Sequence, residues 1–171
     1  MILPARILPR KGARVPLAAR PPRPILSGMR AALALALILA KPAAAWEFTP
    51  LPVCTLSHDA GAVSIRVTHD PAQADPYAIA VTRAAGWPAG PVFAIRYDGD
   101  RALVIQTTRQ VLSDGGRTLT VTDRGFGNVL DGLEFNRSAT ALIGDVAEAV
   151  LLEGAAEPVR AFRACATAPI A

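Results

Sequence analysis

The stretch Val63-Ser64-Ile65-Arg66-Val67-Thr68 decides the fold class, because apolar and polar side chains alternate along it without a break. Successive side chains of a β-strand point to opposite faces, so this alternation is typical of a strand with one buried face. Similar short runs recur between turn residues about every ten positions, which is the spacing of a sandwich or barrel. These runs are residues 77–81, 93–97, 103–105, 118–122, 129–135, 139–143 and 146–152. We therefore predict a mainly β domain, an antiparallel β-sandwich or flattened barrel.

Two connections carry hairpin signals, and the end of the chain carries a helix signal. Asp98-Gly99 and Asp114-Gly115-Gly116 each separate two strand runs, as hairpin turns do. Val159, Phe162 and Cys165 follow one another at three-residue intervals, which places them on one face of a helix. We expect a short C-terminal helix that packs Phe162 against the sheet.

An export signal precedes this domain. Arg30 supplies a positive charge, and residues 31–40 are an unbroken run of Ala, Leu and Ile. Ala43-Ala44-Ala45 then provides a small-residue cleavage site, so we predict that residues 29–45 are a cleaved signal peptide. An uncleaved membrane anchor is the weaker alternative, since the apolar run is about half of the ~20 residues that span a bilayer.

The residues before Met29 fit no folded element. Residues 1–28 carry six basic side chains, several prolines and no acid. We interpret them as the result of a start codon assigned too early, with Met29 as the true first residue, or as a disordered basic leader.

The net charge changes sign when this leader is removed. The whole chain has a formal charge of +4, but residues 46–171 contain ten arginines, no lysine and fourteen acidic residues, which gives −4. The electrostatic basis for binding phosphate backbones is then lost, and we expect no nucleic-acid partner. The remaining length suits a single domain with one core and no stable membrane span after cleavage.

Cys54 and Cys165 are the two cysteines of the chain. An even number of cysteines in an exported protein predicts a disulfide, and two separate buried thiols are the alternative. Their wide separation lacks the C-x-x-C spacing of a metal site. A bridge closing so long a loop would stabilise the fold by ~4–5 kcal/mol in the chain-entropy model.

A family resemblance accompanies these features. Trp46 and Cys54 follow the export signal, short strands fill the middle, and the pattern Gly154-x7-Phe162-x2-Cys165 closes the chain. This combination resembles small periplasmic proteins of alphaproteobacteria, in particular the invasion-associated locus B type. The resemblance implies a β-rich protein of the bacterial envelope, located in the periplasm. It offers no catalytic residues that could be carried over.

The two histidines do not form a predicted metal or catalytic site. His58 and His69 each precede an aspartate in turn-like sequence, and no third ligand stands at a suitable spacing. Ser57-His58-Asp59 contains the residue types of a catalytic triad, but neighbours in an extended chain point to opposite sides. We predict no catalytic residues. A small hydrolase is the weaker alternative, and a pocket converging on either histidine would favour it.

The most unusual loop is Arg124-Gly125-Phe126-Gly127-Asn128. Gly-x-Gly is shared with phosphate-binding loops, but a third glycine, a lysine and a following helix are missing, so we expect no nucleotide cofactor. We favour the interpretation that Phe126 folds back into the core. The alternative is an exposed aromatic side chain that contacts a partner, flanked by Arg124 and Asn128. These three are the candidate binding residues.

The function that fits these features is a non-enzymatic periplasmic binding or interaction module, with an unknown protein or small molecule as its partner. A structural or stress-protective envelope protein is the alternative, which the absence of any pocket would favour.

Overall fold

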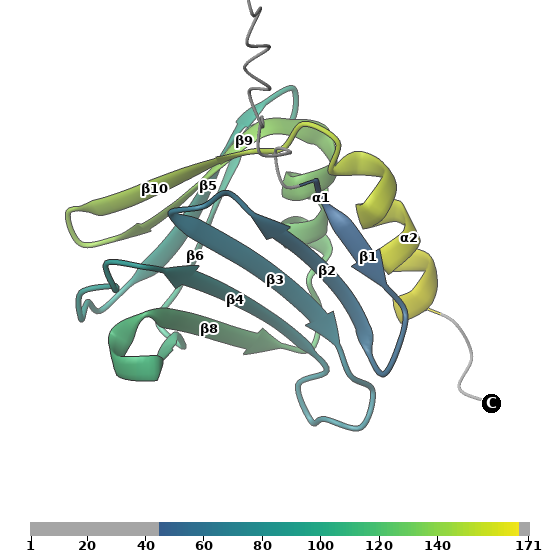
Figure 1. The fold of residues 1–171 in the computed structure, drawn as a ribbon, viewed down its shortest axis with the longest axis horizontal. Helices are drawn as coiled ribbons and strands as arrows, with labels where there is room; N and C mark the ends of the chain where they lie inside the picture. The colour runs from purple at the N-terminus through teal and green to yellow at the C-terminus, as the bar shows by residue number, and fades with distance from the viewer. Residues whose placement is uncertain (1–44, 168–171) are drawn as a thin grey trace, which may run out of the picture. The chain divides into compact units, whose positions relative to one another are not determined.

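The computed structural model describes residues 45–167, so the predicted leader and nearly all of the predicted signal peptide lie outside the described residues (Figure 1). Within this range the chain forms ten strands and two α-helices. The strands form two antiparallel sheets, which confirms the predicted mainly β fold. The sheets pack on one another and remain separate, as in a sandwich, and do not close into a barrel within residues 45–167.

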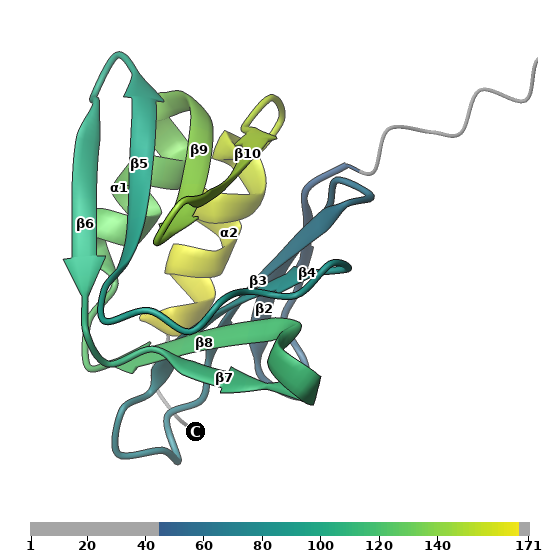
Figure 2. The same ribbon diagram turned by 90° about the vertical axis from the view of Figure 1, so that its left-hand side faces the viewer.

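The larger sheet has six strands. In spatial order they are β1 (Glu47–Thr49), β2 (Cys54–Asp59), β3 (Val63–His69), β4 (Tyr77–Arg83), β8 (Thr118–Asp123) and β7 (Val111–Ser113). The smaller sheet has four strands. They are β10 (Val146–Leu151), β9 (Asn136–Ile143), β5 (Phe93–Gly99) and β6 (Leu103–Thr107). Figure 2 shows β5, β6 and β9 running across the direction of β7 and β8.

The chain builds these sheets hairpin by hairpin. Strands β1 to β4 form a meander, and the β5–β6 hairpin then begins the smaller sheet. The chain returns to the larger sheet with β7 and β8, which places β8 beside β4. The predicted turns lie at the ends of these hairpins: Gly99 ends β5, and Asp114–Gly116 form a 3₁₀ turn between β7 and β8. After a helix, the β9–β10 hairpin completes the smaller sheet beside β5.

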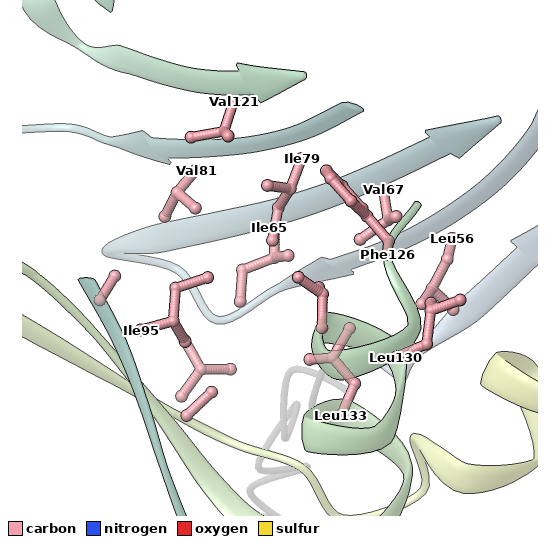
Figure 3. Packing of buried hydrophobic residues seen from close by; sticks show 14 of the residues in the cluster. Leu56, Ile65, Val67, Ile79, Val81, Ile95, Val121, Phe126, Leu130 and Leu133 are labelled. Atoms are coloured by element: carbon pink, nitrogen blue, oxygen red, sulfur yellow. The ribbon is translucent and has the colours of Figure 1, made fainter. Parts of the chain in front are cut away.

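The alternating sequences produce one hydrophobic core between the sheets. Val63, Ile65 and Val67 of β3 are buried, whereas Arg66 between them is exposed. Inward-facing residues of both sheets meet the first helix in this core, as Figure 3 shows for Ile79, Ile95 and Leu133. The alternation that predicted the strands therefore also selects the core side chains.

Residues 129–135 are helical, and the prediction of a strand there was wrong. They belong to helix α1 (Gly127–Phe135), which buries Val129, Leu130 and Leu133. These three lie at positions i, i+1 and i+4, which is a helical face, whereas a strand would need alternation. Gly132 allows the close contact of this helix with the smaller sheet, because a Cβ atom there would lie 2.4 Å from Cε2 of Tyr97.

The predicted C-terminal helix and disulfide are both present. Helix α2 (Ala156–Ala166) buries Val159 and Phe162 completely. Cys54 at the start of β2 and Cys165 in the last turn of α2 form a disulfide with a Cα–Cα distance of 6.1 Å. This bond attaches the final helix to the larger sheet.

Ion pairs join the two helices. Arg163 of α2 contacts Asp131 of α1 at 2.5 Å and Glu134 of α1 at 3.1 Å. One cation therefore bridges both acids of α1 and fixes the helices side by side.

Candidate binding cleft

A cleft of about 550 Å³ opens between the two sheets at the N-terminal end of α1. One wall comes from β4 and β8 of the larger sheet, the other comes from β5 and β6 of the smaller sheet, and the loop before α1 closes one end. The lining residues are Ile79, Phe93, Ile95, Ile105, Gln106, Thr107, Arg109, Val121, Asp123, Gly125, Phe126, Gly127, Asn128 and Val129. The volume lies in the range of pockets that hold small molecules, about 300–1,000 Å³.

The floor of the cleft is apolar. Branched aliphatic and aromatic side chains line it from both sheets and from α1. They are Ile79, Phe93, Ile95, Ile105, Val121, Phe126 and Val129. Ile105 is only half-buried, because β6 is the edge strand of its sheet and pairs with β5 alone among the described strands. An apolar ligand group that enters the cleft would gain roughly 25 cal/mol of binding free energy for each Å² of its apolar surface that is removed from water.

Phe126 forms part of this floor. Its side chain is 5% exposed and stacks on the Tyr77 ring at a centroid distance of 5.5 Å. Figure 3 shows the ring extending from the start of α1 toward the larger sheet, near Ile79 and Val67. The favoured interpretation, that Phe126 folds back into the core, is confirmed, although one side of its site borders the cleft.

The other two candidate residues lie apart from one another. Asn128 is exposed in the first turn of α1 and lines the cleft. Arg124 does not line it; its side chain is 85% exposed and lies 3.6 Å from the carboxylate of Asp75. The structure thus brings Phe126 and Asn128 to one site and leaves Arg124 outside it.

A helix does follow the Gly-x-Gly loop, contrary to our reading of the sequence. Helix α1 begins at Gly127, and no side chain of the described part of the chain caps its N-terminus. The absence of the third glycine and of the lysine still separates this loop from phosphate-binding loops.

Two side chains that the sequence did not indicate form an ion pair at the mouth. Arg109, in the connection from β6 to β7, contacts the carboxylate of Asp123 at the end of β8. The Asp123 carboxylate also accepts a hydrogen bond from the backbone N–H of Arg124 at 2.6 Å. The hydroxyl of Thr107 accepts one from the backbone N–H of Arg109 at 3.1 Å. No local pattern could have paired a residue of the β6–β7 connection with one at the end of β8.

The histidines lie away from the cleft. His58 is in strand β2 and stacks on Trp46 at 4.7 Å, so its assignment to a turn was wrong. His69 ends β3 and contacts the Tyr77 ring at 4.5 Å. Neither histidine is among the residues that line the cleft. Within residues 45–167 no group of three or more His, Cys, Asp or Glu side chains is placed to hold a metal ion.

Comparison with known proteins finds no matching family model, no similar curated sequence and no similar solved structure. Neither α1 nor α2 is long and apolar enough to cross a membrane, and the same holds throughout the described part of the chain.

Proposed function

We propose that this protein is a non-enzymatic binding module of the bacterial periplasm that holds a small amphipathic molecule in the cleft between its sheets. The observation that carries the proposal is the combination of an apolar floor with a polar mouth in one cleft of about 550 Å³. Pockets for small molecules likewise combine apolar walls with polar groups that orient the ligand.

The alternatives have less support. A purely structural envelope protein would need no such cleft. A hydrolase would need a nucleophile and a base that converge on its pocket, and the lining of the cleft within residues 45–167 includes no histidine, serine or cysteine.

The periplasmic location rests on the predicted signal and on the disulfide. Disulfides persist in oxidising compartments, among them the periplasm. If the signal is cleaved as predicted, the exported protein begins at Trp46, whose side chain is already buried in the domain. Intact-mass measurement of protein released from the periplasm tests this; a mass that retains residues 29–45 contradicts it.

Binding can be tested by filling the cleft with a side chain. Ile105 lines the cleft and is half-buried, so Ile105→Trp should occupy the space at little cost to folding. Val104 precedes it on the same strand and is 56% exposed, so Val104→Trp adds the same ring on the opposite face. This second variant is the matched control.

The assay is titration with Nile red, a neutral dye that fluoresces in apolar sites. We expect saturable binding of one dye per wild-type chain, unchanged binding by Val104→Trp, and loss of binding by Ile105→Trp. No saturable binding to the wild type, or equal binding by Ile105→Trp, would refute a ligand site in this cleft.

A further inference from the structure

The charges at the mouth of the cleft cancel. Among its lining residues, the charged side chains are Arg109 and Asp123, one of each sign, and they form an ion pair. Both are about half exposed, with side-chain exposures of 54% and 45%. Asp123 is held in place by a second donor, the backbone N–H of Arg124. The mouth therefore offers polarity without an unpaired charge.

This pairing decides which head group the cleft can accept. A carboxylate that approaches Arg109 also approaches Asp123, and an ammonium group that approaches Asp123 meets Arg109. Either ion meets a like charge beside the opposite one, so it gains little net attraction, and any hydration that it loses on entering is not compensated. A neutral head group loses less hydration and finds hydrogen-bonding side chains beside the pair, namely the hydroxyl of Thr107 and the amide of Asn128.

The cleft has room for at least one octyl-length chain. Its volume of about 550 Å³ corresponds to roughly eighteen water molecules at ~30 Å³ each. A second gap beyond Ile79 and Ile95 has only about 10 Å³, too little to receive more of a ligand. The floor thus ends at these two side chains.

We propose that the Arg109–Asp123 pair makes the cleft selective for neutral single-chain amphiphiles, with an amide or hydroxyl head group, over carboxylates and amines of the same chain length. This inference rests on the proposed function, because it names the ligand class and the selectivity-determining residues of the same cleft.

The test uses three probes that share an octyl-length chain: octanamide, octanoate and octylammonium. At neutral pH the first is neutral and the other two are charged. Isothermal titration should give a Kd for octanamide that is lower by about tenfold or more than for either ion, a difference that titration resolves readily.

Neutralising one partner should change the preference. In Asp123→Asn the Arg109 cation loses its partner, and octanoate should bind more tightly than octanamide. In Arg109→Gln the Asp123 carboxylate is unpaired, and octylammonium should gain affinity instead. A thermal melt of each variant verifies that it folds, which is expected for changes at a half-exposed pair.

A second exposed ion pair supplies the control. Arg96 and Asp98 on β5 lie 3.0 Å apart with side-chain exposures of 51% and 54%, and neither lines the cleft. Asp98→Asn and Arg96→Gln make the same changes in net charge and should leave all three affinities unchanged.

The outcomes separate the two proposals. If none of the probes binds the wild type, the proposed function fails and the selectivity fails with it. If all three bind alike and Asp123→Asn changes nothing, the cleft binds amphiphiles but the ion pair does not select them. If Asp98→Asn shifts octanoate binding as much as Asp123→Asn does, net charge and not the local pair is responsible, and the inference is overturned.

Discussion

Gly132 lies where helix α1 meets the smaller sheet. Replacing it with alanine changes the free energy of unfolding through two effects of opposite sign. In a helix interior, alanine is favoured over glycine by about 1 kcal/mol. Here, however, the new Cβ would lie 2.4, 2.5 and 2.6 Å from three atoms of the Tyr97 ring. Carbon atoms pack best at ~3.5–4.0 Å, so the ring or the helix must move by about 1 Å.

Both partners lie in the core. Tyr97 is 1% exposed, and Gly132 is itself buried. Overpacking a core costs about 1–3 kcal/mol, and three simultaneous close contacts place this site at the upper end. With the propensity gain subtracted, we expect Gly132→Ala to lower the free energy of unfolding by about 2 kcal/mol. For a domain of this size the melting temperature should fall by roughly 6–10 °C.

The control is Gly127→Ala, the same change at the first residue of the same helix. An added Cβ there meets nothing within 4 Å, so the free energy of unfolding should change by less than about 0.5 kcal/mol. Thermal and urea melts followed by circular dichroism measure both variants. If Gly132→Ala is as stable as the wild type or more stable, the close approach of α1 to Tyr97 is refuted. Rescue of Gly132→Ala by Tyr97→Leu would locate the strain at this contact.

Four further predictions concern stability. The hydroxyl of Tyr97 is buried without a hydrogen-bond partner in the described part of the chain, so Tyr97→Phe should be neutral or stabilising by about 1 kcal/mol; a marked loss in a urea melt would contradict this. Burial also raises the pKa of Tyr97 above its ordinary value of 10.0, so at higher pH the tyrosine ionises more readily in the unfolded chain than in the folded one. The wild type should therefore lose stability as pH rises above that value, and Tyr97→Phe should lose less. Melts of both proteins at alkaline pH measure the difference. Reducing the Cys54–Cys165 disulfide, which joins residues 111 positions apart, should cost ~4–5 kcal/mol in the chain-entropy model, and an unchanged melting temperature under reducing conditions would refute that estimate. Phe126→Ala should cost about 3 kcal/mol, the low end for a buried phenylalanine because the ring borders the cleft, and a loss below about 0.5 kcal/mol would indicate an exposed loop instead.

The sequence by itself determined the parts of the structure that depend on neighbouring residues. The alternation in residues 63–68 predicted both the strand and its buried face, and Asp98-Gly99 predicted a hairpin between β5 and β6. The three-residue spacing of Val159, Phe162 and Cys165 predicted α2, and the even number of cysteines predicted the bridge. The strand, hairpin and helix signals are local because backbone conformation and the direction of a side chain are set within a few residues. The bridge was predicted from the cysteine count of the whole chain and is not a local signal.

Helix α1 shows where this local reading fails. Residues 129–135 are a short apolar run, and such a run does not distinguish a strand from a buried helix. Tertiary packing decides here: Gly132 fits against Tyr97, and Arg163 of α2 pairs with both acids of α1. These partners are distant in sequence, so no window around α1 contains them.

Only the tertiary structure determined where the cleft lies and which residues line it. Its walls come from four strands and one helix. At its mouth, Arg109 of the β6–β7 connection forms an ion pair with Asp123 at the end of β8. The loop that the sequence singled out contributes Phe126 and Asn128, but nothing local predicts that Ile105 of an edge strand faces them. The period of a strand determines which side chains point inward. The space left between two sheets depends on how they pack, which is a property of residues far apart in the chain.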